Sequence, residues 1–179
     1  MILKKMRGFT LIELLIVVAI IGILAVLLVP NAITAIQKSK QKSTMKSITT
    51  IGTAVADYIT DNGNAPDSPS GNTIDAGDAF YDALSPFYVR VIPELDEWGT
   101  RFNVWCNEDA DEYGISDPLD GDFLISSYGR GGDQEGWTFD ENDPEAGRFI
   151  VNEMSDFEYD LVAFSGSWIR APKTGGTGT

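Results

Sequence analysis

Histidine is absent from this 179-residue chain, which leaves few side chains that could carry out chemistry. Without imidazole, the Ser-His-Asp and Cys-His arrangements that activate a nucleophile are excluded, as is any histidine metal site. The single cysteine, Cys106, stands between Trp105 and Asn107 and is expected to be a small buried side chain rather than a reactive thiol. We therefore expect no catalytic residue in this chain.

Charge is divided unevenly along the chain. Residues 1–46 hold seven Lys or Arg and one acid, Glu13, whereas residues 47–179 hold six basic side chains and 26 acids. Affinity for nucleic acid comes largely from Lys and Arg that neutralise phosphates, so the acidic part of the chain repels nucleic acid. No direct binding of nucleic acid is expected.

An apolar run at residues 9–29 contains a single charge, that of Glu13. As a helix, these 21 residues would extend about 31 Å, enough to cross the hydrocarbon core of a bilayer. The preceding residues, MILKKMRG, carry three cations that favour a cytoplasmic N-terminus. The run therefore predicts a single transmembrane segment.

Two ordinary kinds of membrane segment do not fit this run. A cleaved secretory signal has an apolar stretch of about 7–15 residues and an A-x-A-like site, whereas this run is longer and no such site follows it. A plain signal anchor explains the length but not Glu13, because an uncompensated carboxylate in the membrane costs about 2.5–3.5 kcal/mol. Glu13 is therefore expected to have a partner of opposite charge.

Residues 8–33, GFTLIELLIVVAIIGILAVLLVPNAI, resemble the N-terminal signature of type IV pilins and type II secretion pseudopilins. The resemblance implies that a prepilin peptidase cleaves after Gly8 and that the new N-terminus, Phe9, is methylated. It also implies that Glu13 neutralises the terminal ammonium group of its own or a neighbouring subunit during assembly. Opposite charges attract strongly in a low-dielectric medium, so this pairing would supply the partner that Glu13 requires.

Two residues weaken a helix here, Gly22 within the apolar run and Pro30 just after it. Glycine costs backbone entropy, and proline lacks an N–H and clashes with the preceding turn. We expect a kink, and the resemblance implies local unwinding in a packed filament. Beyond Pro30 the apolar spacing predicts an amphipathic helix that ends at Asn62-Gly63. Its apolar positions are Ile33, Ile36, Met45, Ile48, Ile51, Val55, Tyr58 and Ile59. Its lysines, Lys38, Lys40, Lys42 and Lys46, are expected to form a solvated face with anionic lipid head groups as a contact.

The rest of the chain alternates turn-rich stretches with segments rich in β-branched and aromatic residues. Residues 64–78 are expected to be a loop and residues 79–86 a short helix or turn. Strands are predicted at residues 87–92, 101–106, 122–129, 148–153 and 159–171. The predicted fold class is α+β, a long N-terminal helical spine with a small antiparallel β-sheet head packed on its second half.

This reading divides the chain into four parts. They are a leader at residues 1–8, a transmembrane and assembly half of the spine at 9–30, an amphipathic half of the spine at 31–62 and a globular acidic head at 63–179. Only the second part is expected to lie in the bilayer.

Four head segments are also similar to the major pseudopilin of type II secretion systems. They are DYITDNGNAP at 57–66, PELDEWGTRF at 93–102, SSYGRGGD at 126–133 and DLVAFSGSWIRAP at 160–172. The second segment resembles a Pro-Asp-Pro-Trp-Gly turn, with Glu97 in place of the second proline. Residues 106–122 and 136–156 look like insertions, which leaves room for a filament that does not serve secretion.

This resemblance implies a calcium ion that stabilises the head. Calcium takes about six to eight oxygen ligands, which carboxylates, hydroxyls and loop carbonyls supply. Ser127 and Asp133 match the family's calcium loop, and Asp156 or Asp160 would supply the second arm. The chain departs from the family pattern at Gly131, where an aspartate is expected, and no EF-hand spacing is present.

The resemblance implies a structural subunit, not an enzyme, that polymerises with its own copies into a helical filament. The implied partners are the prepilin peptidase, an inner-membrane assembly platform, minor pilins or pseudopilins, and the lipid bilayer before assembly. The implied location is the bacterial inner membrane, with the N-terminus cytoplasmic and the head periplasmic, and then a periplasmic pseudopilus or cell-surface filament.

Three functions stay open from the sequence. A type II secretion pseudopilus is favoured, and a type IV pilus for adhesion, motility or DNA uptake is the alternative. A membrane-tethered module that binds calcium or acts on glycosides through paired carboxylates is the alternative of another class.

Overall fold

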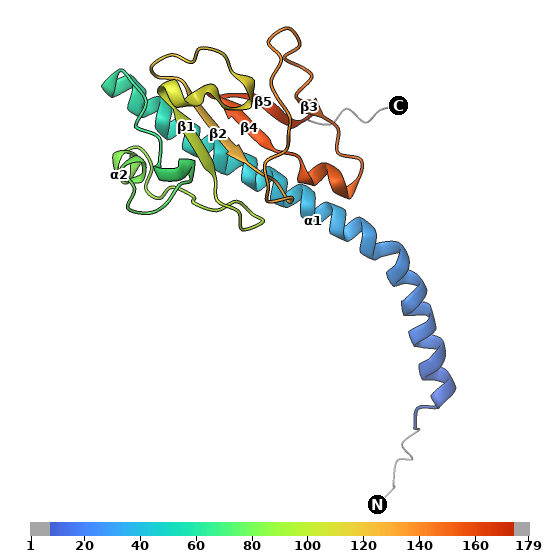
Figure 1. The fold of residues 1–179 in the computed structure, drawn as a ribbon. Coiled ribbons are helices and arrows are strands. Elements are labelled where there is room, and N and C mark those ends of the chain that lie inside the picture. Colours follow the sequence, from blue (N-terminus) through green and yellow to red (C-terminus); the bar gives the residue numbers. More distant parts are fainter. Residues whose placement is uncertain (1–7, 174–179) are drawn as a thin grey trace, which may run out of the picture. The chain divides into compact units, whose positions relative to one another are not determined.

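The structure, a computed structural model, describes residues 8–173, and the predicted leader residues 1–7 lie outside them. The chain divides into two compact units, Met1–Gln37 and Lys38–Thr179. The helices are α1 (Leu11–Asn62) and α2 (Ala79–Leu84), with short 3-10 helices η1 (Ser70–Asn72), η2 (Asn107–Gly114) and η3 (Met154–Glu158). The strands are β1 (Asn103–Cys106), β2 (Phe123–Ser127), β3 (Arg148–Phe149), β4 (Leu161–Phe164) and β5 (Ser167–Pro172). The predicted α+β class is confirmed (Figure 1).

Helix α1 is bent one turn before its internal proline, Pro30. The parts Leu11–Val26 and Leu28–Asn62 meet at 41°. Proline lacks the N–H that would bond to the carbonyl of Val26, and its ring crowds that carbonyl, so a bend at this place follows from the residue itself. The predicted kink is therefore present.

The C-terminal end of α1 also lies where the sequence indicated. Gly63 has a φ of +87° and donates its N–H to the carbonyl of Ile59 at 2.7 Å. Glycine adopts this left-handed conformation without a steric penalty, so it closes the helix directly after Asn62.

The head contains one five-stranded sheet in the order β1-β2-β4-β5-β3. Neighbouring strands are antiparallel except β3 and β5, which run parallel. Four of the five predicted strand segments overlap the observed strands, and the last of them forms the β4-β5 hairpin. The predicted antiparallel sheet is confirmed for β1, β2, β4 and β5, and the short edge strand β3 pairs with β5 in parallel.

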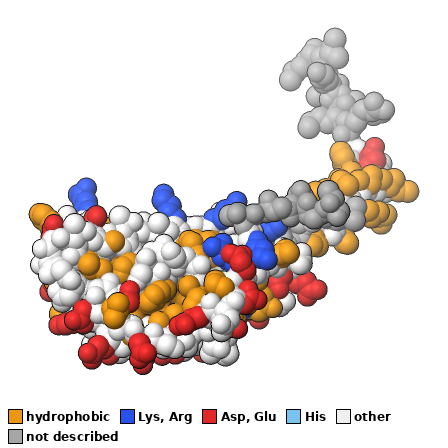
Figure 2. All heavy atoms as spheres, turned by 90° about the horizontal axis from the view of Figure 1, so that it is seen from above, with side chains coloured by type: hydrophobic (Ala, Val, Ile, Leu, Met, Phe, Trp, Pro, Cys, Tyr) orange, Lys and Arg blue, Asp and Glu red, His pale blue; other side chains and the backbone are white. Residues whose placement is uncertain are grey.

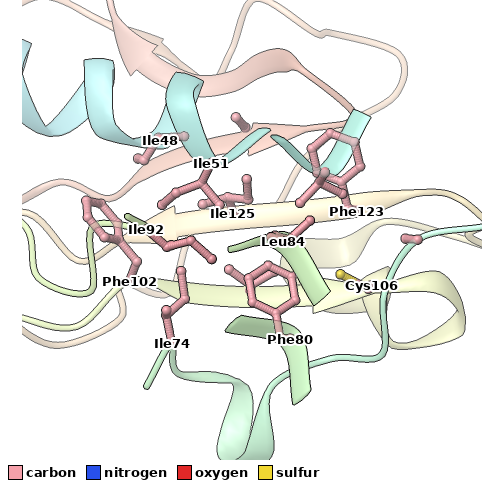
Figure 3. Packing of buried hydrophobic residues seen from close by; sticks show 14 of the residues in the cluster. Ile48, Ile51, Ile74, Phe80, Leu84, Ile92, Phe102, Cys106, Phe123 and Ile125 are labelled. Carbon is pink, nitrogen blue, oxygen red and sulfur yellow. The ribbon is translucent and has the colours of Figure 1, made fainter. Parts of the chain in front are cut away.

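One face of the sheet packs on the second part of α1 (Figure 3). Ile48 and Ile51 of the helix are fully buried in the same cluster as Phe123 and Ile125 of β2. A Cβ at Gly52 would lie 3.5–3.6 Å from these two β2 side chains, an ordinary van der Waals distance, so helix and strand pack closely here. The predicted apolar stripe of α1 therefore faces the sheet from Met45 onward, while Ile33 and Ile36 are exposed.

The opposite face of the sheet is buried as well. Trp105, Leu124 and Val162 alternate with the helix-facing residues along their strands, and they pack with Tyr113 and Trp137 from outside the sheet. The segments expected to be insertions, 106–122 and 136–156, supply part of this cover. They are therefore part of the core and not only surface additions.

The prediction of a strand at residues 87–92 is wrong. After α2 the N–H groups of Tyr88 and Val89 both donate to the carbonyl of Leu84, which holds the segment in a turn. Phe87 is exposed, while Ile92 is buried in the core. The segment thus lies beside the sheet as irregular chain anchored by Ile92.

Candidate functional site

The chain enters α1 through a capping box formed by Thr10 and Glu13. Glu13 Oε2 accepts hydrogen bonds from the N–H of Thr10 at 2.9 Å and from its hydroxyl at 2.7 Å, and Thr10 Oγ1 accepts the N–H of Glu13 at 3.3 Å. Gly8 and Phe9, the predicted cleavage and methylation positions, directly precede this box, and the Phe9 side chain is 78% exposed. The Thr-x-x-Glu spacing is a sequence signature of such boxes, and it is the signal that could have predicted the role of Thr10.

The first unit exposes apolar side chains around its whole helical surface. Leu11 is 88% exposed, and most of the apolar residues that follow it are more than half exposed. A side chain at Gly22 would meet no atom within 4 Å. An apolar surface of this extent requires a non-aqueous surrounding, either lipid or other helices.

The segment that is predicted to cross the membrane is part of a bent helix. Among the described residues, no single straight helix is long and apolar enough to cross a membrane. The bent pair Leu11–Val26 and Leu28–Asn62 together have the required length and composition. The Thr34 hydroxyl donates to the carbonyl of Pro30 at 3.1 Å, next to the bend.

In the head, the segment PELDEWGTRF forms a turn around the buried carboxylate of Asp96. Oδ1 of Asp96 accepts the N–H groups of Trp98 and Thr100, both at 2.9 Å. Oδ2 accepts the hydroxyl of Ser127 at 2.7 Å, and Ser127 Oγ in turn accepts the N–H of Gly129 at 3.2 Å. One carboxylate thus joins this turn to the end of β2 and the loop after it.

The same turn is also fixed to α1 through Glu97. Its carboxylate accepts the hydroxyl of Ser43 at 2.6 Å, its carbonyl accepts Nζ of Lys40 at 2.8 Å, and its N–H donates to Thr44 Oγ1 at 3.2 Å. Proline at this position would have neither the N–H nor the carboxylate. Glu97, which stands where the resembled turn has a proline, therefore supplies two contacts with α1 that proline could not make.

A buried ionic cluster lies at the same end of the sheet, because Asp160 directly precedes Leu161, the partner of Ser127. Asp160 is fully buried, and its Oδ2 accepts the hydroxyl of Tyr113 at 2.7 Å and the N–H of Glu135 at 3.2 Å. Burial raises the pKa of Asp160 to about 7, although the hydrogen bond from Tyr113 acts in the opposite direction. Burial also raises the pKa of Glu135, against the attraction of Arg170.

Arg170 of β5 supplies the only cation of this cluster among the described residues. It is 8% exposed and forms an ion pair with Glu135. Its guanidinium carbon lies 4.9–5.1 Å from the ring centroids of Trp137, Phe149 and Tyr159. Cation–π attraction to three rings and one ion pair together hold segments that are far apart in sequence.

The sequence predicted that Cys106 is a small buried side chain and not a reactive thiol. Cys106 is a free cysteine with 2% exposure, and burial raises the pKa of its thiol to about 12. A thiol that stays protonated at neutral pH is a poor nucleophile, so the expectation of an inert buried side chain is confirmed.

The four residues predicted to bind calcium have separate roles in the structure. Ser127 donates to the carboxylate of the turn, and Asp160 accepts from a buried tyrosine. Asp156 accepts two backbone N–H groups at the start of η3, and Asp133 is exposed. Within residues 8–173, no group of three acidic, histidine or cysteine side chains is arranged to hold a metal. These residues do not form a carboxylate cage as they stand, and calcium binding stays a prediction.

Comparison with known proteins covers both the N-terminus and part of the head. Residues 3–29 match the family model described as the prokaryotic N-terminal methylation motif. Type II secretion system core protein G of Escherichia coli (strain K12) is 37% identical over 105 residues, which are 55% of this chain and 70% of that protein. The core protein G of Pectobacterium carotovorum subsp. carotovorum is 31% identical over 107 residues, 56% of this chain and 67% of that protein.

The N-terminal part is also shared with a pilin. The type IV major pilin protein PilA of Myxococcus xanthus (strain DK1622) is 47% identical over 55 residues, 31% of this chain and 25% of that protein. No solved structure gives a significant match to the chain.

A long capped apolar helix that begins with the methylation motif and carries an α+β head defines the class of pilin-like proteins. Within that class, the matches to core protein G cover 67% and 70% of the two relatives at 31% and 37% identity. The chain belongs to the family of type II secretion system core protein G.

Proposed function

We propose that this chain is a structural subunit of the pseudopilus of a type II protein secretion system. The observation that carries the proposal is the length of the similarity to core protein G. Matches of 105 and 107 residues are longer than the 62 residues up to the end of α1, so they must include head residues. The match to the pilin is shorter, at 55 residues. This difference favours a secretion pseudopilus over a type IV pilus for adhesion, motility or DNA uptake.

In this proposal the apolar part of α1 has two successive surroundings. Before assembly it spans the inner membrane, with the N-terminus in the cytoplasm and the head in the periplasm, as the leader cations favour. During assembly it leaves the lipid and packs against the same part of other copies, with the assembly platform and minor pseudopilins as partners. Neither state requires catalysis, and the proposed role is purely structural.

Glu13 can serve both its cap and an incoming ammonium group. Its Oε2 accepts both bonds from Thr10, and no described residue donates to its Oε1. A carboxylate offers about four lone-pair positions, so a cation can bind while the capping box persists. We propose that the terminal ammonium group of processed Phe9, from the same or a neighbouring copy, binds there.

The test of this function is the mass of the N-terminal peptide of the native protein isolated from its host. We expect cleavage after Gly8 and a methylated Phe9, and we expect Met1 to be retained in a strain that lacks the prepilin peptidase. A native chain that keeps Met1 while the peptidase is present would contradict the proposed function. This outcome would favour a tethered module instead.

Calcium binding to the head is a second proposal. Ser127 ends β2 and pairs with Leu161, the first residue of β4, so Ser127 and Asp160 lie at the same end of the sheet. Their side chains face opposite sides of it, Ser127 toward Asp96 and Asp160 toward Tyr113, so in this arrangement an ion would contact one of them and not both. We expect calcium at 100 times its dissociation constant to stabilise the full-length protein in detergent by about 2.7 kcal/mol. Isothermal titration and thermal unfolding with and without chelator measure this.

An Asp133→Asn variant should lose the stabilisation by calcium, and the control variant Asp117→Asn should keep it. Absence of both binding heat and a chelator effect in the wild type would end the proposal.

A further inference from the structure

Three lysines form an exposed row on the part of α1 that belongs to the head. Lys38, Lys42 and Lys46 are four residues apart and so share one face of the helix. In the described range, no hydrogen bond or ion pair involves the side-chain ammonium group of any of the three, although the carbonyl of Lys46 accepts the hydroxyl of Thr50. Lys40 differs from them, because it is half-buried and donates to the carbonyl of Glu97.

This lysine row has no acidic neighbour within ten residues on its own helix. Residues 14–56 contain no Asp or Glu. Like charges four residues apart on a helix repel each other, so each of the two neighbouring pairs weakens α1 slightly. An anionic surface from outside the helix would turn this repulsion into attraction.

An acidic segment of matching size lies on the head. Residues 140–145 contain Asp140, Glu141, Asp143 and Glu145, all exposed, and no Lys or Arg occurs between residues 131 and 147. None of the four acids is ion-paired with a described residue. The segment belongs to the loop between β2 and β3, which projects from the head away from α1 (Figure 1). On the face shown in Figure 2, many acidic side chains gather along the lower edge of the head.

We propose that the lysine row of one copy docks against the acidic segment 140–145 of a neighbouring copy in the filament. The inference rests on the proposed function, since it requires that copies polymerise. Contact between two different surfaces of the same chain does not pair off into a closed dimer but can continue from copy to copy, as a helical filament requires. Complementary charge on the two surfaces fixes the register and speeds encounter more than it adds affinity.

Anionic lipid is the other partner whose charge fits the lysine row. Lys38 lies 29 residues and Lys46 lies 37 residues after Phe9, which corresponds to about 44 and 56 Å along a helix. The hydrocarbon core is about 30 Å thick, and the attraction of lipid head groups decays within about 10 Å. When the apolar part spans the bilayer, the far end of the row at Lys46 therefore stands beyond the head groups and most of their attraction. This favours a protein partner.

The test reverses the charges in the full-length protein expressed in its secretion host. One variant carries Lys38→Glu, Lys42→Glu and Lys46→Glu, and a second carries lysine at the four acidic positions of segment 140–145. We expect each to reduce the amount of sheared filament about tenfold, and the combination of both to restore it to within about twofold of wild type. A control that carries Asp117→Lys and Asp120→Lys in another loop should assemble normally. Thermal unfolding of the detergent-solubilised variants reports whether the head remains folded.

A cross-link provides a second measurement that does not depend on charge reversal. A variant with Lys42→Cys and Asp143→Cys is expected to form disulfide-linked chains in oxidised filaments, while the buried Cys106 does not react. Wild-type filaments together with normal assembly of both reversal variants would overturn this inference and leave the proposed function intact. If the lysine variant assembles normally but no longer binds phosphatidylglycerol vesicles as the wild type does, the lysine row contacts the membrane instead. A wild-type protein that keeps Met1 and forms no filament would overturn both.

Discussion

Replacing Arg170 with alanine is expected to lower the free energy of unfolding by about 3–5 kcal/mol, because it leaves a partly buried carboxylate without its cation. The guanidinium group pairs with Glu135 and lies about 5 Å from three aromatic ring centroids. Alanine would remove the ion pair, the cation–π contacts and most of the side-chain volume in one change. Urea denaturation of the full-length protein in detergent, followed by tryptophan fluorescence, measures the loss.

Two further variants separate the contributions at Arg170. Arg170→Lys keeps the charge but not the flat guanidinium that stacks on rings, so we expect it to lose an intermediate amount. Arg90→Ala removes an arginine that is exposed, and its effect should stay within about 0.5 kcal/mol. An Arg170→Ala protein as stable as Arg90→Ala would show that the cluster does not stabilise the head.

The position of Arg170 explains why this cluster could not be predicted from the sequence. A charged residue in a short strand normally indicates a solvent-facing position, and the local pattern at 167–172 gives no other signal. The partners of Arg170 come from residues 135, 137, 149 and 159, which belong to separate segments. Only the folded arrangement brings them together.

The burial of the sheet face that points away from α1 was not predicted, for a related reason. Trp105 and Leu124 sit in strands that read as continuous apolar runs, which is typical of strands buried on both sides. The segments that cover them, around Tyr113 and Trp137, lie outside the stretches that are similar to the major pseudopilin and therefore looked like insertions. Two aromatic residues anchor them in the core, and such isolated anchors are not visible as a periodic pattern.

The N-terminal part was predictable because its signals are local. A 21-residue apolar run, a proline and an Asn-Gly pair fix the helix, its bend and its end through neighbouring residues alone. The spacing of Gly8, Phe9 and Glu13 is equally local, and a family model covers it. What local sequence did not indicate is the contact of Glu97 with three residues of α1, since that contact joins positions more than 50 residues apart.

Raising the pH from 5 to 8 is expected to destabilise the head through Asp160. In the folded chain its pKa is raised by burial from 3.8 to about 7. Between these values the folded state binds a proton that the unfolded state has released, so stability falls as the pH rises through this window. The difference corresponds to about 4 kcal/mol at full ionisation. Tyr113, Glu135 and Arg170 are the polar and charged groups that act on this carboxylate.

An Asp160→Asn variant isolates this effect from the repulsion among the other acids of the head. Asparagine cannot ionise, and its side-chain oxygen still accepts hydrogen bonds from Tyr113 and Glu135. We expect the variant to be about as stable as wild type at pH 5 and about 2–4 kcal/mol more stable at pH 8, as judged by urea denaturation across the range. Asp111→Asn removes one exposed acid and should leave the pH dependence nearly unchanged. Parallel curves for wild type and Asp160→Asn from pH 5 to 8 would mean that Asp160 is ionised throughout, and that Arg170 compensates its charge more fully than burial opposes it.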